Sequence, residues 1–119
     1  MTACLMAGAV ALTLAAPAFT LHWTHSVEKV EWREDWRIGA EMLTLTRVAI
    51  KGSGAGMEPA GDARLENGWW VWAPMTPLPA LTLAASGATG AGWILCSGGK
   101  CHELGAAPGE PIRLAPCGG

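Results

Sequence analysis

The stretch Val30-Glu31-Trp32-Arg33-Glu34-Asp35-Trp36-Arg37-Ile38 decides the fold class of this chain. Charged residues at its odd positions alternate with apolar residues at its even positions, which is the period of two of a half-buried β-strand. Glu34 breaks the alternation, because its parity puts a carboxylate on the apolar face between Trp32 and Trp36. A carboxylate on such a face costs free energy unless it is paired, hydrogen-bonded or protonated. Glu34 therefore predicts a polar pocket or a buried ion pair on that face.

The preceding segment, residues 19–27, alternates in the opposite phase, with its odd residues toward the core. The phase changes between Val27 and Val30, where no Gly, Pro, Asn or Asp is available for a tight hairpin. We therefore expect a β-bulge in one long, bent strand, at His25-Ser26-Val27-Glu28.

The following segment, residues 42–50, is expected to return as an antiparallel strand after a turn at residues 39–41. If Ile38 pairs with Met42, Glu34 faces Thr46 and Arg33 opposes Arg47, which is unfavourable for two like charges. If Ile38 instead pairs with Leu43, Glu34 faces Arg47 and Trp36 faces Leu45. The second register is preferred, and it makes Arg47 the expected partner of Glu34.

The remainder of the chain alternates short apolar runs with Gly- and Pro-rich connections. Residues 69–72, 81–84, 93–96, 101–104 and 111–115 are expected to form strands, and no convincing amphipathic helix follows residue 18. The seven tryptophans are interpreted chiefly as core, with room for an exposed patch in residues 69–72. The sequence thus predicts a single all-β domain over residues 19–119, a small antiparallel β-sandwich or a partly open barrel.

The composition narrows the classes of partner. The chain has 119 residues, of which 15% are charged, and its net charge is −2. It lacks the basic surface that a nucleic-acid backbone requires, so nucleic-acid binding is disfavoured. No cofactor-binding motif is recognised, and none is expected to be needed.

Residues 1–18 are interpreted as a signal peptide or a membrane anchor. An apolar run from Leu5 to Ala16 is followed by Ala16-Pro17-Ala18, a small-x-small pattern of the kind that a signal peptidase cleaves. Anchoring would use residues 3–21, although the run is short for a full membrane span. An ordinary buried segment is the third alternative. Export to the periplasm or another extracytoplasmic compartment is the expectation.

The cysteines suggest one disulfide. Cys96 and Cys101 flank a Gly-rich tetrapeptide, so they are expected to staple two strand ends in an oxidising compartment. A metal site made from these cysteines with His102 and Cys117 is the rival interpretation, but the spacing matches no standard zinc motif. Cys117 is expected to be left unpaired or to bond to another chain.

Two further groups complete the candidate site. His25, Ser26 and Glu28 bring polar groups to the expected bulge, yet no Gly-x-Ser-x-Gly motif or orienting Asp accompanies them, so no catalytic residue is assigned. Downstream, residues 52–57 form a glycine loop whose exposed amides could hold an anion, although a purely structural crossing between sheets explains it as well. The candidate ligand-binding residues are His25, Ser26, Glu28, Glu34, Arg47, Ser53, Gly54, Gly56 and Met57.

The chain resembles a bacterial family, domain of unknown function 1850. The resemblance is carried by the leader and by Leu21-His22-Trp23-Thr24-His25-Ser26-Val27-Glu28, Glu34-Asp35-Trp36, Gly52-Ser53-Gly54-Ala55-Gly56-Met57 and Gly68-Trp69-Trp70. It implies a small exported protein, often encoded beside tripartite ATP-independent periplasmic (TRAP) transporters whose solute receptor is of the immunogenic-protein type. The family has no established activity, so the resemblance supplies no catalytic residue.

Three functional hypotheses follow. The leading one is a non-catalytic accessory or binding protein for such a transporter, whose partner is a membrane subunit, the solute receptor or a small anion such as a carboxylate. The second is a small hydrolase or isomerase that uses His25 with Glu28 or Glu34. The third is a structural envelope domain whose polar cluster only fixes the bulge.

Overall fold

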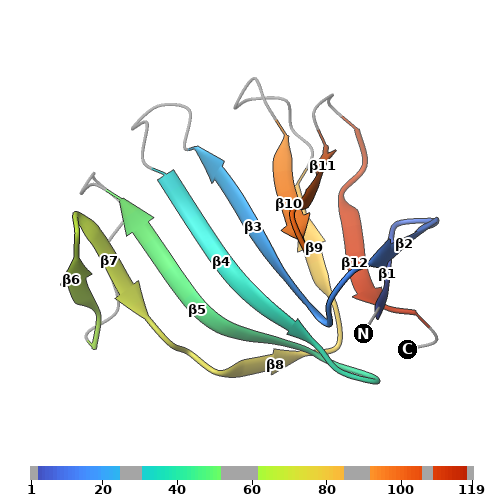
Figure 1. The fold of residues 1–119 in the computed structure, drawn as a ribbon. Helices are drawn as coiled ribbons and strands as arrows, with labels where there is room; N and C mark the ends of the chain where they lie inside the picture. The colour runs from blue at the N-terminus through green and yellow to red at the C-terminus, as the bar shows by residue number, and fades with distance from the viewer. Residues whose placement is uncertain (1–2, 25–30, 52–61, 85–91, 106–108, 118–119) are drawn as a thin grey trace.

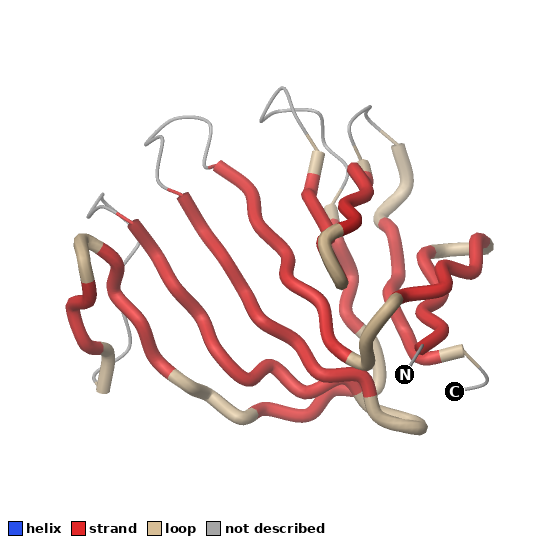
Figure 2. Tube along the Cα trace, in the orientation of Figure 1, coloured by secondary structure: helices blue, strands red, loops and turns tan. Residues whose placement is uncertain are grey.

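The fold, seen in a computed structural model, consists of β-strands arranged in two antiparallel sheets (Figure 1). The structure describes residues 3–24, 31–51, 62–84, 92–105 and 109–117. Throughout these ranges the regular elements are strands, as Figure 2 shows. The first six are β1 (Ala3–Ala7), β2 (Val10–Leu14), β3 (Ala18–Thr24), β4 (Glu31–Ile38), β5 (Leu43–Lys51) and β6 (Arg64–Glu66). The others are β7 (Trp69–Trp72), β8 (Thr76–Leu78), β9 (Leu81–Leu83), β10 (Trp93–Ser97), β11 (Lys100–Leu104) and β12 (Ile112–Pro116).

The larger sheet has the order β11-β10-β3-β4-β5-β7-β6, and β8 pairs with the part of β5 that β7 leaves uncovered. The smaller sheet has the order β2-β1-β12-β9. In Figure 1 the large sheet is strongly curved, with β6 and β7 at one side and the small sheet at the other, beside β10 and β11. The prediction of an all-β domain is confirmed, and the arrangement is a sandwich of two open sheets rather than a closed barrel.

The main core lies between the two sheets. Leu5, Leu14, Leu83 and Leu114 of the small sheet pack with Phe19, Leu21, Trp36, Leu43 and Leu95 of the large one. Each of these side chains is at most 2% exposed. Burying a leucine or a phenylalanine contributes roughly 1.5–3 kcal/mol, so this cluster is the main source of stability. A second, smaller cluster around Val48 and Ile50 covers the part of the large sheet that lies farther along β5.

Residues 1–18 were interpreted as a leader, and the described part of this segment is folded. β1 pairs with β12 and β2, and Leu5, Ala7 and Leu14 are buried. Cys4 is bonded to Cys117, and the Cys117 amide also donates a hydrogen bond of 3.1 Å to the Cys4 carbonyl. This arrangement corresponds to the third alternative, a buried segment. Cleavage after Ala18 stays a prediction. It would remove both strands from the small sheet.

The register between β4 and β5 corrects one expectation. Ile38 pairs with Leu43 and Trp36 with Leu45, as preferred from the sequence. The register then shifts between Asp35 and Trp36, because Thr46 is an extra residue in β5. Its hydroxyl donates a hydrogen bond of 3.1 Å to the carbonyl of Asp35. The expected pairing of Glu34 with Arg47 is therefore wrong.

Two hairpin turns follow from sequence signals. Asn67 and Gly68 have φ angles of 52° and 87°, and they join β6 to β7. Gly98 and Gly99 have φ angles of 59° and 81°, and they join β10 to β11. Positive φ at both central residues is the requirement of a type I′ turn, which suits the twist of paired strands. The bulge expected at residues 25–28 lies outside the described residues.

Candidate functional site

Glu34 lies on the inner face of the large sheet, where two indoles hold its carboxylate. The Trp32 Nε1–H donates to Oε2 and the Trp36 Nε1–H donates to Oε1, each over 3.0 Å. Both donors come from the same strand two residues away, because side chains at positions i and i±2 share a face. Glu34 pairs with Leu21 on one side and Val48 on the other, so its cross-strand neighbours are apolar. The predicted polar position is real, and its partners are tryptophans.

A row of aromatic rings crosses the inner face beyond Glu34. Trp23 packs on Trp32 with ring centroids 6.2 Å apart, and on Trp93 at 5.2 Å. Trp32 also meets Trp72 edge to face at 6.5 Å. These four tryptophans are half-buried, whereas Trp36 is 2% exposed. Trp36 therefore belongs to the core, the other four rings are partly exposed, and the N–H groups of Trp32 and Trp36 satisfy Glu34.

Arg47 lies on the opposite, outer face. It pairs with Asp35, and its guanidinium lies 3.9 Å from the Asp35 carboxylate and 3.9 Å from that of Glu66. The Asp35 carboxylate also lies 3.5 Å from Arg33. These side chains are 29–54% exposed, so each ion pair is worth at most about 1 kcal/mol. The network positions the Arg47 side chain more than it stabilises the fold.

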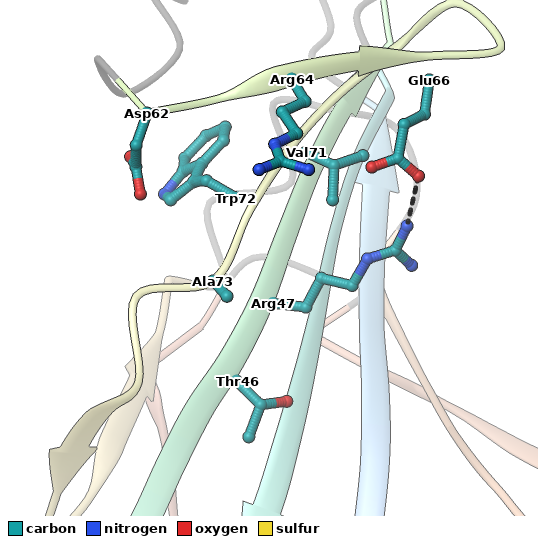
Figure 3. Close-up of a pocket in the computed structure, with 8 residues that line it drawn as sticks. All are labelled: Thr46, Arg47, Asp62, Arg64, Glu66, Val71, Trp72 and Ala73. Carbon is teal, nitrogen blue, oxygen red and sulfur yellow. Dashed lines mark ion pairs between the residues drawn. The ribbon is translucent and has the colours of Figure 1, made fainter.

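A pocket of about 380 Å³ opens beside Arg47, at the edge where the partner of β5 changes from β7 to β8. Two arginines, two acids and several apolar or small residues line it. The lining residues are Thr46, Arg47, Asp62, Arg64, Glu66, Val71, Trp72 and Ala73. Figure 3 shows Arg64 extending from β6 beside Val71, and Arg47 extending from β5 toward Glu66.

Local structure explains why both arginines line this pocket. The Asn67-Gly68 turn folds β6 back along β7, which sets Arg64 opposite Val71. The extra residue at Thr46 changes the parity of β5, which turns Arg47 to the outer face. Arg64, Asp62 and Glu66 were not among the predicted site residues. The Asn67-Gly68 signal could have indicated them, because it fixes which residues lie across from residues 69–72.

The remaining predicted ligand-binding residues cannot be placed relative to this pocket. His25, Ser26, Glu28, Ser53, Gly54, Gly56 and Met57 lie outside the described residues. Of the predicted set, the structure describes Glu34 and Arg47, and it places them on opposite faces.

The cysteine predictions have mixed outcomes. The Cys96–Cys101 disulfide is confirmed and joins directly paired positions of β10 and β11. The expectation of an unpaired Cys117 is wrong, because Cys117 bonds to Cys4 across a sequence separation of 113 residues. Over the described ranges no three His, Cys, Asp or Glu side chains are grouped as metal ligands would be. Nor does the described part contain a helix of the length and apolarity needed to cross a membrane.

Comparison with known proteins gives one match. The model of a family described as a domain of unknown function (DUF1850) matches residues 19–104. No curated protein and no solved structure matches the chain.

Proposed function

The chain belongs to the DUF1850 family, and we propose that it is an extracytoplasmic, non-catalytic binding protein that serves a TRAP-type solute transporter and holds a small carboxylate beside Arg47 and Arg64. The observation that carries the proposal is that two arginines, Arg47 and Arg64, line the same pocket beside the apolar side chain of Val71.

The chemistry of the pocket suits a carboxylate. A guanidinium offers planar, paired N–H donors that match the two oxygens of a carboxylate. The contacts of Arg47 with Asp35 and Glu66 are 3.9 Å long, beyond hydrogen-bond distance, so its donors are not committed to these acids. The volume of about 380 Å³ falls within the usual range for small-molecule sites.

Asp62 and Glu66 restrict the kind of anion. Their two negative charges formally balance those of the two arginines, so the pocket has no net positive charge to attract a polyanion. Recognition must then come from directed hydrogen bonds, which a planar carboxylate makes with arginine. A compact mono- or dicarboxylate is therefore the proposed ligand class.

The state of Glu34 supports a non-catalytic role. Both of its oxygens accept indole N–H groups, from Trp32 and Trp36. Each oxygen therefore already has a hydrogen-bond partner within the fold, which supports a structural role for Glu34.

The proposed location rests on the disulfides. Two disulfides in a chain of this size are characteristic of proteins that fold in an oxidising compartment. The association with a transporter rests on the family resemblance, so the partner would be a membrane subunit or the solute receptor.

Thermal unfolding in the presence of succinate tests the ligand class. Succinamide has the same length without the charges and serves as the control ligand. At a succinate concentration ten times the Kd, the stability should rise by about 1.4 kcal/mol. This corresponds to a Tm increase on the order of 5 °C, with no change in succinamide. If the Tm is the same in succinate and in succinamide, and if glutarate and acetate also leave it unchanged, the carboxylate proposal is contradicted.

A further inference from the structure

The Cys96–Cys101 disulfide lies far from the carboxylate pocket along the sheet order, on the hairpin that ends the large sheet at β11. Cys101 is exposed on this outermost strand, and Cys96 is half-buried on β10. An incoming thiolate can therefore approach the sulfur of Cys101 from solvent. Access to an S–S bond is one of the factors that set the rate of thiol–disulfide exchange.

The disulfide adds little constraint to the folded chain. It spans only five positions, and the two strands are already joined by the Gly98-Gly99 turn and by five cross-strand pairs. The Cys4–Cys117 bond, in contrast, closes a separation of 113 residues and ties β1 to the end of β12. A disulfide that stabilises the fold less is easier to reduce in the folded protein, since its loss removes less of the folding free energy.

A histidine lies beside one of the two sulfurs. The Nε2 atom of His22, on β3, is 3.7 Å from the Cys96 Sγ atom. Cys96 pairs with Thr20, so His22 reaches the sulfur diagonally on the same face. When Nε2 carries a proton, it donates a hydrogen bond to this sulfur. A donor in this position stabilises a Cys96 thiolate more than it stabilises the neutral disulfide, and a stabilised thiolate is a better leaving group.

We propose that Cys96–Cys101 is a reversible thiol–disulfide exchange site whose co-reactant is a dithiol. One thiolate of the dithiol attacks the Cys101 Sγ atom, a new S–S bond forms, and the Cys96–Cys101 bond breaks. The bonding electron pair leaves with Cys96 Sγ, where the His22 N–H stabilises it until the sulfur takes a proton. The second thiol of the dithiol then displaces Cys101 from the mixed disulfide. Two electrons and two protons pass from the dithiol to the protein, and the dithiol becomes a disulfide.

Reduction of the folded, full-length protein by dithiothreitol tests the proposal, with Cys4–Cys117 as the internal reference. Samples are alkylated at intervals, and each cysteine pair is quantified by peptide mass spectrometry. Cys96–Cys101 should be reduced at least about tenfold faster than Cys4–Cys117. Equal rates, or faster reduction of Cys4–Cys117, would overturn the proposal.

The role of His22 is tested by His22→Ala. The matched control is His102→Ala, which lies on the β10–β11 hairpin that carries the disulfide. His22→Ala should slow the reduction of Cys96–Cys101 several-fold and leave that of Cys4–Cys117 unchanged, and His22→Gln, which keeps an N–H donor, should restore part of the rate. A variant that unfolds would speed the reduction of both disulfides and so be recognised. If His22→Ala and His102→Ala react at the wild-type rate, the assignment of His22 is wrong. Reduced thioredoxin, used in place of dithiothreitol, distinguishes a protein dithiol from a small one by the ratio of the two rates.

Discussion

Arg47 and Glu34 lie on opposite faces of the large sheet, although they occupy neighbouring strands and their charges would attract. The shift at Thr46 pairs Arg47 with Asp35 and Glu34 with Val48. As a result, the carboxylate of Glu34 is satisfied by indoles, and the guanidinium of Arg47 lines an open pocket with Arg64. One extra residue in β5 thus separates a structural polar site from a candidate binding site.

The Glu34 site is predicted to stabilise the fold. In Glu34→Gln, the amide oxygen can accept from one indole, while the NH₂ group faces the N–H of the other. The free energy of unfolding should fall by about 1–3 kcal/mol, the usual cost of an unsatisfied, charge-assisted hydrogen bond. Urea unfolding gives this value. The same replacement at the exposed Glu31, on the same strand, should change it by less than about 0.5 kcal/mol. Equal losses in both variants would contradict the structural role of Glu34.

The first two strands are predicted to be required for stability. A chain that begins at residue 19 lacks the buried side chains of Leu5, Ala7 and Leu14, and it leaves Cys117 without Cys4. Loss of the long-range disulfide alone costs about 5 kcal/mol in the chain-entropy model, comparable to the whole stability of many domains. Circular dichroism during heating should show a strongly lowered Tm or no cooperative transition. A truncated chain as stable as the full one would instead fit a removable leader.

The β10–β11 turn is predicted to tolerate only glycine at Gly98. A Cβ atom there would come within 2.5 Å of the Ala15 Cβ atom, and the φ angle is +59°. Gly99 has φ +81° and open space around it, so Gly99→Ala isolates the conformational term of roughly 1–2 kcal/mol. Chemical denaturation should rank the losses as Gly98→Ala above Gly99→Ala, with Gly109→Ala, where the space is also open, close to wild type. The reverse order for the first two would show that the contact with Ala15 is not formed.

A transporter partner is predicted from the family resemblance. The full-length, affinity-tagged protein should retain the solute receptor encoded beside it, or a transporter membrane subunit, during purification. The Arg64→Gln variant should remain folded. Quantitative mass spectrometry of the retained proteins provides the measurement, with an unrelated exported protein of similar size as the control. Equal recovery with both baits would count against an accessory role in transport.

The strand pattern of residues 30–38 was enough to predict the fold class, because side-chain parity depends only on local geometry. The preferred pairing of Ile38 with Leu43 was also right, although one of the grounds for it, the pairing of Glu34 with Arg47, was wrong. The shift at Thr46 could not be predicted, since a bulge in a β-branched, apolar strand has no Gly or Pro to mark it. The error in the partner of Glu34 follows directly from this missed bulge.

The N-terminal segment shows a different limit of the sequence. Short apolar runs have the same composition in a leader and in a buried hairpin, and the pairing of this segment with β12 involves residues more than a hundred positions away, which no local pattern indicates. The Asn67-Gly68 turn, in contrast, is a local signal, and it brings Arg64 opposite Val71. The candidate pocket was accessible to prediction in part, through that turn and through Arg47, which was a candidate residue although its expected partner was wrong.

A titration followed by NMR tests the binding proposal most directly, because side-chain N–H groups report on separate places in the fold. The Arg47 side chain lines the pocket, whereas the Trp36 indole is buried against Glu34. On addition of succinate, the Arg47 Nε–H signal of the full-length protein should shift and saturate, and the Trp36 indole signal should stay in place. Arg64→Gln should weaken the fitted Kd at least about tenfold, a loss of about 1.4 kcal/mol, while Arg113→Gln on β12 should bind as the wild type does. An Arg47 signal that does not move at any succinate concentration, or an unchanged Kd in Arg64→Gln, would contradict a carboxylate site beside Arg47 and Arg64.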